Sequence, residues 1–203
     1  MKAFTICEGY AAPLMHDNID TDLIIRIERI AKLKRGEFAP WAFEANRYFA
    51  DGAEDPSFVL NQVPFRKAQI LISGANFGCG SSREMAVWSI EEFGIRCIIA
   101  QSYGDIFFGN CLQNGVLPIT LEQNQINALA KVAASGATVK VDLQTCTIST
   151  VATGAISFAF PEAQRQALLT GFDEVDQTLK IASQIDRFQQ EDRRVRPWVY
   201  NVG

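Results

Sequence analysis

Residues 69–93 of this 203-residue chain read QILISGANFGCGSSREMAVWSIEEF. The apolar run that opens the stretch predicts a buried strand over 69–73. Apolar side chains recur at helical spacing over 84–93, which predicts a helix. The glycine-rich segment between the two therefore joins the end of a strand to the start of a helix.

That joining segment has the composition of an anion site. Gly78 and Gly80 are free to adopt backbone angles closed to other residues, so peptide N–H groups can face a ligand. The start of the helix adds unpaired N–H donors and the positive end of its dipole. Arg83 supplies a planar fork that suits a carboxylate or phosphate, and Ser81 and Ser82 place hydroxyl groups in the same positive field.

Other interpretations of the segment are open. Ser81 and Glu84 fit a capping box, in which Ser81 caps the helix and Glu84 reaches back to it. The dinucleotide-binding pattern requires a third glycine, and the phosphate loop requires a lysine. After Gly78 and Gly80, the residues Ser81-Ser82-Arg83 offer no third glycine, and the stretch contains no lysine.

The rest of the chain predicts alternating strands and helices, with more strand in the C-terminal third. Two parallel strands joined by a helix imply a right-handed crossover, which puts the glycine turn at the carboxyl end of its strand, where open sheets bind ligands. Further strands are expected at 97–100, 116–119, 139–143 and 156–160, and further helices at 103–114, at 123–134 and from Pro161.

Bulk composition agrees with a soluble enzyme subunit and narrows little else. The formal net charge of −4 argues against a nucleic-acid surface, and no run approaches the length of a membrane span, so neither partner is expected. The first residues lack a signal-peptide pattern, which predicts the cytoplasm. The five cysteines are scattered without a C-x-x-C pair, and His16 is the single histidine. A disulfide framework, a zinc site and an iron–sulfur ligand set are therefore not predicted, nor is a metal site.

Four motifs together resemble a known family. They are Gly-Ala-Asn-Phe-Gly-Cys-Gly-Ser-Ser-Arg-Glu at 74–84, Asp-Asn-Ile-Asp-Thr-Asp at 17–22, Asp-Pro-Ser-Phe-Val-Leu-Asn at 55–61 and Gly-Asp-Ile-Phe-Phe-Gly-Asn at 104–110. The chain resembles the swivelling domain of the aconitase superfamily, and within it the small subunits of 3-isopropylmalate dehydratases. The resemblance implies an α/β fold of layered β/β/α type. It predicts a single domain over 1–203 with a helical tail from about 173 to 203.

The resemblance also implies a hydro-lyase that removes water from a 2-hydroxy diacid and adds it back at the neighbouring carbon, as in leucine biosynthesis. It implies no cofactor in this chain and a [4Fe-4S] cluster in a large partner subunit. Ser81 would be the base, and Ser82 and Arg83 would bind a substrate carboxylate. The turn of Gly78, Cys79 and Gly80 would support the site.

A second element of the resemblance places Arg35 among the residues that bind substrate carboxylates. Asp22 is then expected to orient Arg35 through a charged pair. The alternative is that Asp20 or Thr21 caps a turn and that Arg35 lies on a solvated surface.

One residue departs from the family pattern. The family usually continues Ser-Ser-Arg-Glu with a histidine, and this chain has Met85, which cannot carry a proton. A sister hydro-lyase acting on a dimethylmalate, citramalate or methylcitrate type of diacid therefore stays open. A non-enzymatic anion-binding module is the more distant alternative.

Two further segments are each open to two interpretations. Aromatic and arginine residues over 32–48 fit either a protein interface or a loop packed on its own core. The arginines after 186 fit either a solvated end of the chain or a surface for an acidic partner.

Overall fold

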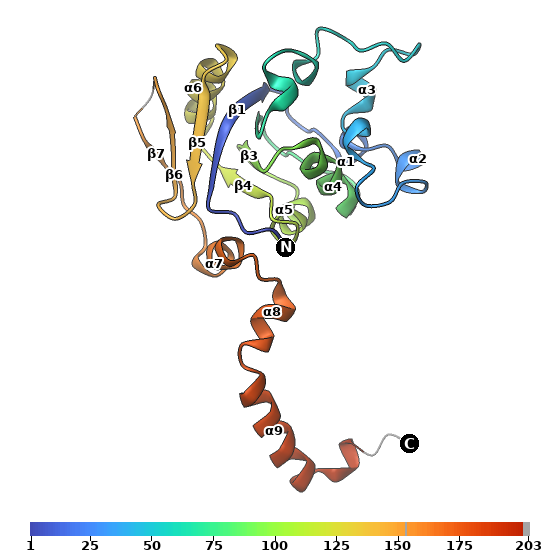
Figure 1. Ribbon diagram of the computed structural model, residues 1–203, viewed down its shortest axis with the longest axis vertical. Helices are drawn as coiled ribbons and strands as arrows, with labels where there is room; N and C mark the ends of the chain where they lie inside the picture. Colours follow the sequence, from blue (N-terminus) through green and yellow to red (C-terminus); the bar gives the residue numbers. More distant parts are fainter. Residues whose placement is uncertain (153, 201–203) are drawn as a thin grey trace. The chain divides into compact units, whose positions relative to one another are not determined.

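The computed structural model describes residues 1–152 and 154–200, and its contacts divide the chain into two units, 1–171 and 172–203. Within the described part of the first unit, seven strands form one sheet in the order β4-β3-β2-β1-β5-β6-β7 (Figure 1). The strands are β1 (Ile6–Leu14), β2 (Ile70–Ser73), β3 (Cys97–Ala100), β4 (Leu117–Thr120), β5 (Thr138–Asp142), β6 (Thr147–Thr150) and β7 (Ile156–Ser157).

The long strand β1 joins a parallel half of the sheet to an antiparallel half. Its residues 11–14 pair in parallel with β2, and its residues 6–10 pair antiparallel with β5. β2, β3 and β4 continue in parallel, whereas β5, β6 and β7 continue antiparallel. The strands predicted after residue 69 exist, but β1 and β6 had not been predicted.

Two helices connect the strands of the parallel half, α4 (Glu84–Phe93) between β2 and β3 and α5 (Asp105–Gln113) between β3 and β4. α6 (Gln123–Ala134) joins β4 to β5, and α7 (Glu162–Thr170) follows β7. Short turns of helix follow β1 at α1 (Thr21–Ile24), α2 (Ile27–Ile30), η1 (Ala39–Trp41), α3 (Glu44–Arg47), η2 (Val59–Asn61) and η3 (Phe65–Lys67). The helices expected around 84–93, 103–114 and 123–134 are therefore confirmed.

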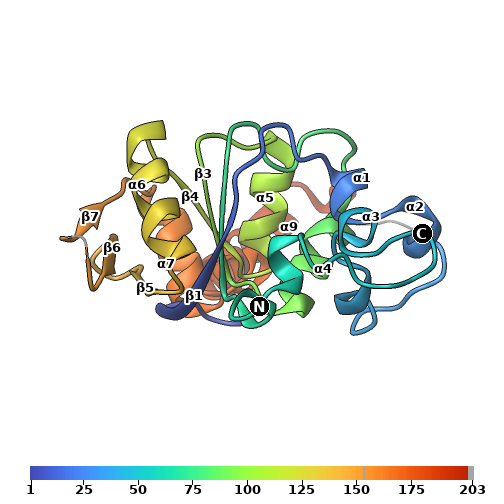
Figure 2. The same ribbon diagram turned by 90° about the horizontal axis from the view of Figure 1, so that it is seen from above.

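Alternate residues of the central strands enter two separate cores. Leu71 and Ile98 face a core that contains α4 and α5, whereas Ile70 and Ile99 face a core that contains α6 and residues of β5 and β6. All four side chains are fully buried. Figure 2 shows the same arrangement from above, with α6 and α4 on different sides of the parallel strands. This layered α/β organisation agrees with the predicted fold class.

The last predicted strand is shorter than expected. β7 ends at Ser157, which pairs with Thr147, the first residue of β6. The next partner would be Cys146, whose positive φ of 51° places it in the turn between β5 and β6. The ladder therefore ends there, although Phe158 N still donates to Cys146 O at 3.0 Å, and the Phe158 side chain packs into the core that contains α6.

The aromatic segment over 32–48 contributes mainly to the protein's own core. Phe38 and Phe43 are each 1% exposed and belong to the core beneath α4. Arg47 is buried as well, and its Nε donates to Asn61 Oδ1 at 3.0 Å. The interpretation of this segment as a loop packed on its own core therefore holds for these residues.

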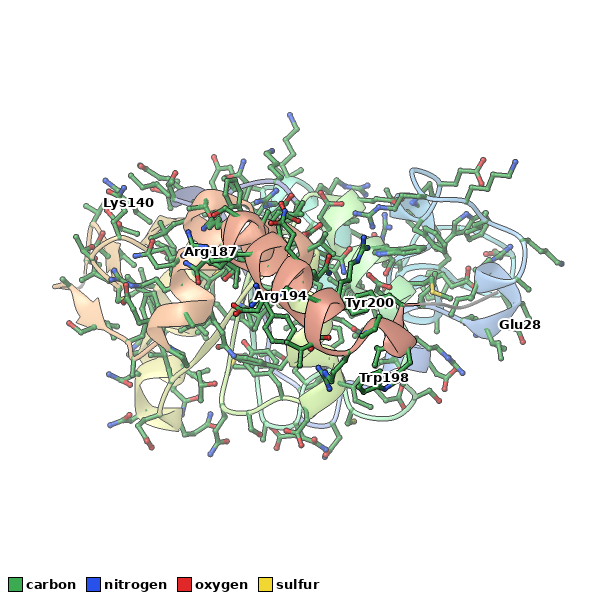
Figure 3. All side chains as sticks on the ribbon, turned by 90° about the horizontal axis from the view of Figure 1, so that it is seen from below. Glu28, Lys140, Arg187, Arg194, Trp198 and Tyr200 are labelled. Atoms are coloured by element: carbon green, nitrogen blue, oxygen red, sulfur yellow. The ribbon has the colours of Figure 1, made fainter. Side chains whose placement is uncertain are left out.

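The second unit consists of helices. They are α8 (Glu174–Leu179), α9 (Ala182–Val195) and the short η4 (Pro197–Val199). Figure 3 labels Arg187 and Arg194 on α9, and Trp198 and Tyr200 beyond its end. Phe188 and Trp198 are largely exposed. Across residues 1–152 and 154–200, no helix combines the length and the apolar character of a membrane span.

Candidate active site at the glycine turn

The glycine turn lies where three loops meet at the carboxyl ends of β1, β2 and β3. Gly78 N donates to Ile19 O at 2.7 Å, and Thr21 N donates to Cys79 O at 2.9 Å. On the other side, Phe77 N donates to Ser102 O at 3.0 Å. Because parallel strands end at the same edge of the sheet, the motifs at 17–22, 74–84 and 104–110 are brought together there.

Close packing fixes the path of the turn. Gly78 has φ 71°, and a Cβ atom added to it would lie 2.1 Å from Phe107 Cγ. Gly80 has φ 93°, but there a Cβ atom would meet its nearest neighbour only at 3.5 Å. Phe77 is fully buried, with its ring centroid 5.4 Å from that of Phe107. The two glycines are thus required for different reasons, Gly78 for close approach and Gly80 for backbone conformation alone.

Ser81 follows the turn and is exposed, while hydrogen bonds to its carbonyl oxygen hold its backbone. Its carbonyl oxygen accepts from Thr21 Oγ1 at 3.0 Å and from Arg83 N at 2.8 Å. Thr21 is 1% exposed, so its hydroxyl makes this hydrogen bond away from bulk water. Thr21 was not predicted to take part in the site, because the buried position of its hydroxyl follows from the pairing of two distant segments.

A hollow of about 240 Å³ adjoins Ser81. It is lined by the turn 78–81 and by the segment 104–107, which begins α5. Ser82 is exposed and Cys79 is half-buried. The backbone N–H groups at the start of α5 lie beside the hollow, and the first turn of a helix leaves them without intrahelical partners. The acidic Asp105 lines the hollow as well, so Arg83 is the cationic side chain of this site.

Arg83 forms an ion pair with Asp22, and the side chain of Arg83 is 16% exposed against 58% for Asp22. Asp22 stands in the first turn of α1, whose N-cap Asp20 accepts from Leu23 N at 2.7 Å. The expectation that Asp22 orients Arg35 is therefore wrong, because Asp22 pairs with Arg83. The alternative that Asp20 caps a turn is confirmed.

The alternative interpretation of Ser81 and Glu84 as a capping box is not what the structure shows. The N-cap of α4 is Arg83, two residues after Ser81, and no side chain caps it. Glu84 does not reach back; its Oε1 accepts from Asn114 Nδ2 at 2.9 Å. Ser81 is left outside the helix, because Gly80 turns the chain through a left-handed conformation just before it.

Arg35 lies near the other end of α4. Its NH2 atom is 2.9 Å from Glu91 Oε2, and its NH1 atom is 3.7 Å from Glu92 Oε1. Backbone N–H groups of Gly36 and Phe38 also donate to Glu92, at 2.7 and 2.6 Å. The structure thus brings Asp22, Ser81, Ser82 and Arg83 together with the turn 78–80, but it does not bring Arg35 to them.

Met85 occupies the first turn of α4, half-buried against the core that contains α4 and α5.

The loop after β3 is anchored by Tyr103, whose hydroxyl lies 2.8 Å from Ile98 O and 2.9 Å from Ile119 O. Burial raises the pKa of Tyr103 well above its usual value, so this hydroxyl stays neutral and holds the loop.

All five cysteines are free thiols. Cys97 and Cys111 are fully buried and belong to different cores, and burial raises the pKa of both thiols. Within residues 1–152 and 154–200, no three His, Cys, Asp or Glu side chains gather as metal ligands would. The described residues of this chain therefore do not fit an iron–sulfur cluster, which requires three or four converging thiolates.

Comparison with known proteins gives the class of domain first. Residues 1–124 match the family described as Aconitase C-terminal domain. A solved structure titled 3-isopropylmalate dehydratase, from Methanocaldococcus jannaschii, superposes with a TM-score of 0.65 at 28% identity, covering 91% of this chain and 99% of that one. The swivelling-domain fold predicted from the motifs is thereby confirmed.

Curated relatives are more similar in sequence than this solved structure, and their names specify one subunit of the enzyme. The 3-isopropylmalate dehydratase small subunit of Roseobacter denitrificans is 46% identical over 201 residues, covering 98% of this chain and 100% of that protein. The protein of the same name from Rhodospirillum rubrum is 45% identical and covers 98% of this chain and 97% of its own length. The chain therefore belongs to the family of 3-isopropylmalate dehydratase small subunits.

Proposed function

We propose that this chain is one half of a hydro-lyase that interconverts 2-isopropylmalate and 3-isopropylmalate by dehydration and rehydration, with Ser81 as the base. The observation that carries the proposal is the exposure of Ser81 beside Arg83 on a turn that neighbouring loops pin on both sides. The names of the relatives at 44–46% identity over nearly the whole chain support the same activity.

Ser81 Oγ would take the proton from the carbon beside a substrate carboxylate. That proton is weakly acidic, so an alkoxide-like oxygen is required, and it needs electrostatic support. The N–H groups that follow Gly78 in the turn and the Arg83 guanidinium would supply this support from fixed positions, without reorganisation during the reaction; the N–H of Gly78 itself donates to Ile19 O. The buried Thr21 hydroxyl holds the Ser81 carbonyl and so limits where Oγ can lie.

Arg83 and Ser82 would bind a carboxylate of the substrate. The pair with Asp22 restricts the rotamers of Arg83, which leaves its remaining N–H donors aimed in a defined direction. Arg35 would join them only if its loop left Glu91 and Glu92, so we retain it as a second carboxylate ligand that acts after such a movement.

The other half of the site would come from a large subunit in the cytoplasm. A [4Fe-4S] cluster held by that subunit would supply Lewis-acid chemistry at the substrate hydroxyl. This chain contributes the complementary groups, namely the base and the carboxylate-binding arginine. The hollow of about 240 Å³ beside Ser81 is small for an enclosed substrate site, in keeping with a site completed by a second chain.

The test is Ser81→Ala in the reconstituted pair of subunits. Loss of a positioned base costs about 10²–10⁴-fold in kcat. Ser135→Ala is a matched control, because Ser135 is an exposed serine that bonds only locally to Val132 O. Full turnover by Ser81→Ala in an intact complex, with the same kcat as the Ser135→Ala control, would remove Ser81 from the base role.

A further inference from the structure

A second and larger hollow lies beside α2 and α3, at the end of the first unit opposite β7 (Figure 2). Its volume is about 710 Å³, within the range of about 300–1,000 Å³ typical of small-molecule sites. Its lining shares no residue with the hollow beside Ser81. We call it the Arg26–Arg29 pocket; its principal side chains are Arg26, Arg29, Trp41, Glu44, Tyr48 and Phe49.

The pocket carries an excess positive charge. Glu44 is 9% exposed, and its carboxylate lies 2.7 Å from Arg29 Nε and 3.5 Å from Arg26 Nε. Among the described residues, Glu44 is the one carboxylate that pairs with either arginine. Two guanidinium groups therefore face one carboxylate, and the balance is one positive charge in a partly dry setting.

The uncompensated charge belongs mainly to Arg26. Arg29 makes the short bond to Glu44, whereas Arg26 approaches it only at 3.5 Å, beyond ordinary hydrogen-bond length. The side chain of Arg26 is 54% exposed, against 34% for Arg29. Arg26 thus keeps donors for a further anion, and its fork geometry suits a carboxylate.

Aromatic side chains form the rest of the wall. The guanidinium carbon of Arg29 lies 3.4 Å from the ring centroid of Trp41, a cation–π stack that fixes the arginine and covers one of its faces. Tyr48 and Phe49 line the same hollow, and Phe49 is 52% exposed. An exposed phenylalanine next to an uncompensated arginine offers an apolar contact and an ionic contact side by side.

We propose that the Arg26–Arg29 pocket binds a small organic carboxylate with an apolar or aromatic body. The carboxylate lies on Arg26, and the body lies against Trp41, Tyr48 and Phe49. A single excess charge favours a monoanion, and a bare inorganic anion gains nothing from the aromatic wall. Because Arg29 already neutralises Glu44, that carboxylate does not oppose the ligand. The site is separate from Ser81 and does not depend on the proposed reaction.

The experiment titrates the full-length chain with 4-phenylbutanoate, with its amide and with inorganic phosphate, followed by calorimetry and by backbone amide NMR. The expected result is saturable binding of the carboxylate with shifts over residues 26–52. Binding of the amide should be at least about 10-fold weaker, the loss expected for one charge-assisted contact. Binding of phosphate should also be at least about 10-fold weaker, because phosphate has no apolar body to bury against the aromatic side chains.

Variants assign the contact to Arg26. Arg26→Ala and Arg26→Gln should each weaken binding of 4-phenylbutanoate at least about 10-fold. Both should keep the wild-type circular dichroism spectrum, because the side chain is mostly exposed. Arg66→Ala is the control, since Arg66 is a similarly exposed arginine that pairs with Glu54 and does not line the pocket. Turnover by the reconstituted enzyme should survive all three changes.

Several results would overturn the proposal. Equal binding of the carboxylate and the amide would show that no ionic contact contributes to binding. Unchanged affinity in folded Arg26→Gln would show that Arg26 does not bind the ligand. An equal loss of affinity in Arg66→Ala would show that binding depends on the net charge of the chain and not on a contact with Arg26. Loss of binding when the large subunit is added would show that the pocket is covered in the complex, and would assign it to the subunit interface instead.

Discussion

The two glycines of the turn beside Ser81 should respond differently to the same substitution. Gly78→Ala places a Cβ atom 2.1 Å from Phe107 Cγ, and φ at Gly78 is 71°. Phe107 is 2% exposed and packs edge-on against Phe77, so it has little room to move. A left-handed conformation costs a residue with a Cβ atom about 1–2 kcal/mol. Displacing a well-packed neighbour adds about 1–3 kcal/mol.

Gly78→Ala should therefore lower the free energy of unfolding by about 2–5 kcal/mol. Gly36→Ala provides the matched control, because Gly36 has φ 96° but no atom within 4 Å of an added Cβ. Its cost should be the backbone term alone, about 1–2 kcal/mol. Gly80→Ala should resemble Gly36→Ala, since its nearest neighbour lies at 3.5 Å.

Urea unfolding, followed by tryptophan fluorescence, measures these differences. Trp41 and Trp88, two of the three tryptophans, pack against the same core as Phe107, so a change in emission reports on loss of that core. We expect Gly78→Ala to lower the free energy of unfolding well below that of the other two variants. Gly80→Ala and Gly36→Ala should lower it by smaller and nearly equal amounts. If Gly78→Ala cost no more than Gly36→Ala, the close approach of Phe107 would not constrain the turn.

Three further predictions follow from the same geometry. Thr21→Val should lower kcat about 10- to 100-fold by releasing the Ser81 carbonyl, whereas Thr21→Ser should restore it; equal kcat in both variants would contradict a positioning role. Asp22→Asn should raise KM by no more than about 5-fold in steady-state assays, because Asp22 is 58% exposed and its ion pair with Arg83 contributes only about 0.2–1 kcal/mol. A larger rise in KM would contradict this value. Burial, partly offset by a nearby guanidinium, raises the pKa of the Cys7 thiol from 9.0 to about 11. The unfolded chain then loses this proton first, so the contribution of the Cys7 thiol to the free energy of unfolding should fall by about 1.4 kcal/mol per pH unit between pH 9 and 11, in addition to the contributions of the other buried thiols and Tyr103. Cys7→Ala should remove that part of the slope in urea titrations, and an unchanged slope would exclude the thiol as its source.

Local pattern was enough to predict the elements around the site. The strand before the glycine turn, the helix after it and the next parallel strand were all confirmed, because each has a clear apolar period of its own. β1 was not predicted, since Gly9 and Pro13 interrupt it and only long-range pairing with β2 and β5 makes it a strand. Its tight packing against Gln69, which a Cβ at Gly9 would meet at 2.5 Å, has no local signal.

The site was predicted in part for the same reason. Ser81, Ser82 and Arg83 adjoin one another in sequence, so their common location needed no knowledge of the fold. The partner of Arg83 did not follow, because Asp22 reaches it only through the pairing of two loops 61 residues apart. Arg35 was predicted to lie at the site but does not. The loop that carries it is held by Glu91 and Glu92, and neither residue was predicted to be its partner. Pairing between distant charged side chains depends on tertiary structure, which sequence spacing does not encode.

The measurement that tests the central claim most directly is turnover of 3-isopropylmalate under anaerobic conditions by this chain, by the large subunit and by the two together. Dimethylmalate, citramalate and methylcitrate serve as competing substrates. The account predicts formation of the unsaturated acid from 3-isopropylmalate only when both chains are present. Turnover by either chain alone would contradict a shared active site. An intact complex that used only another diacid would contradict the assigned substrate, and would point to Met85 as a mark of a different specificity.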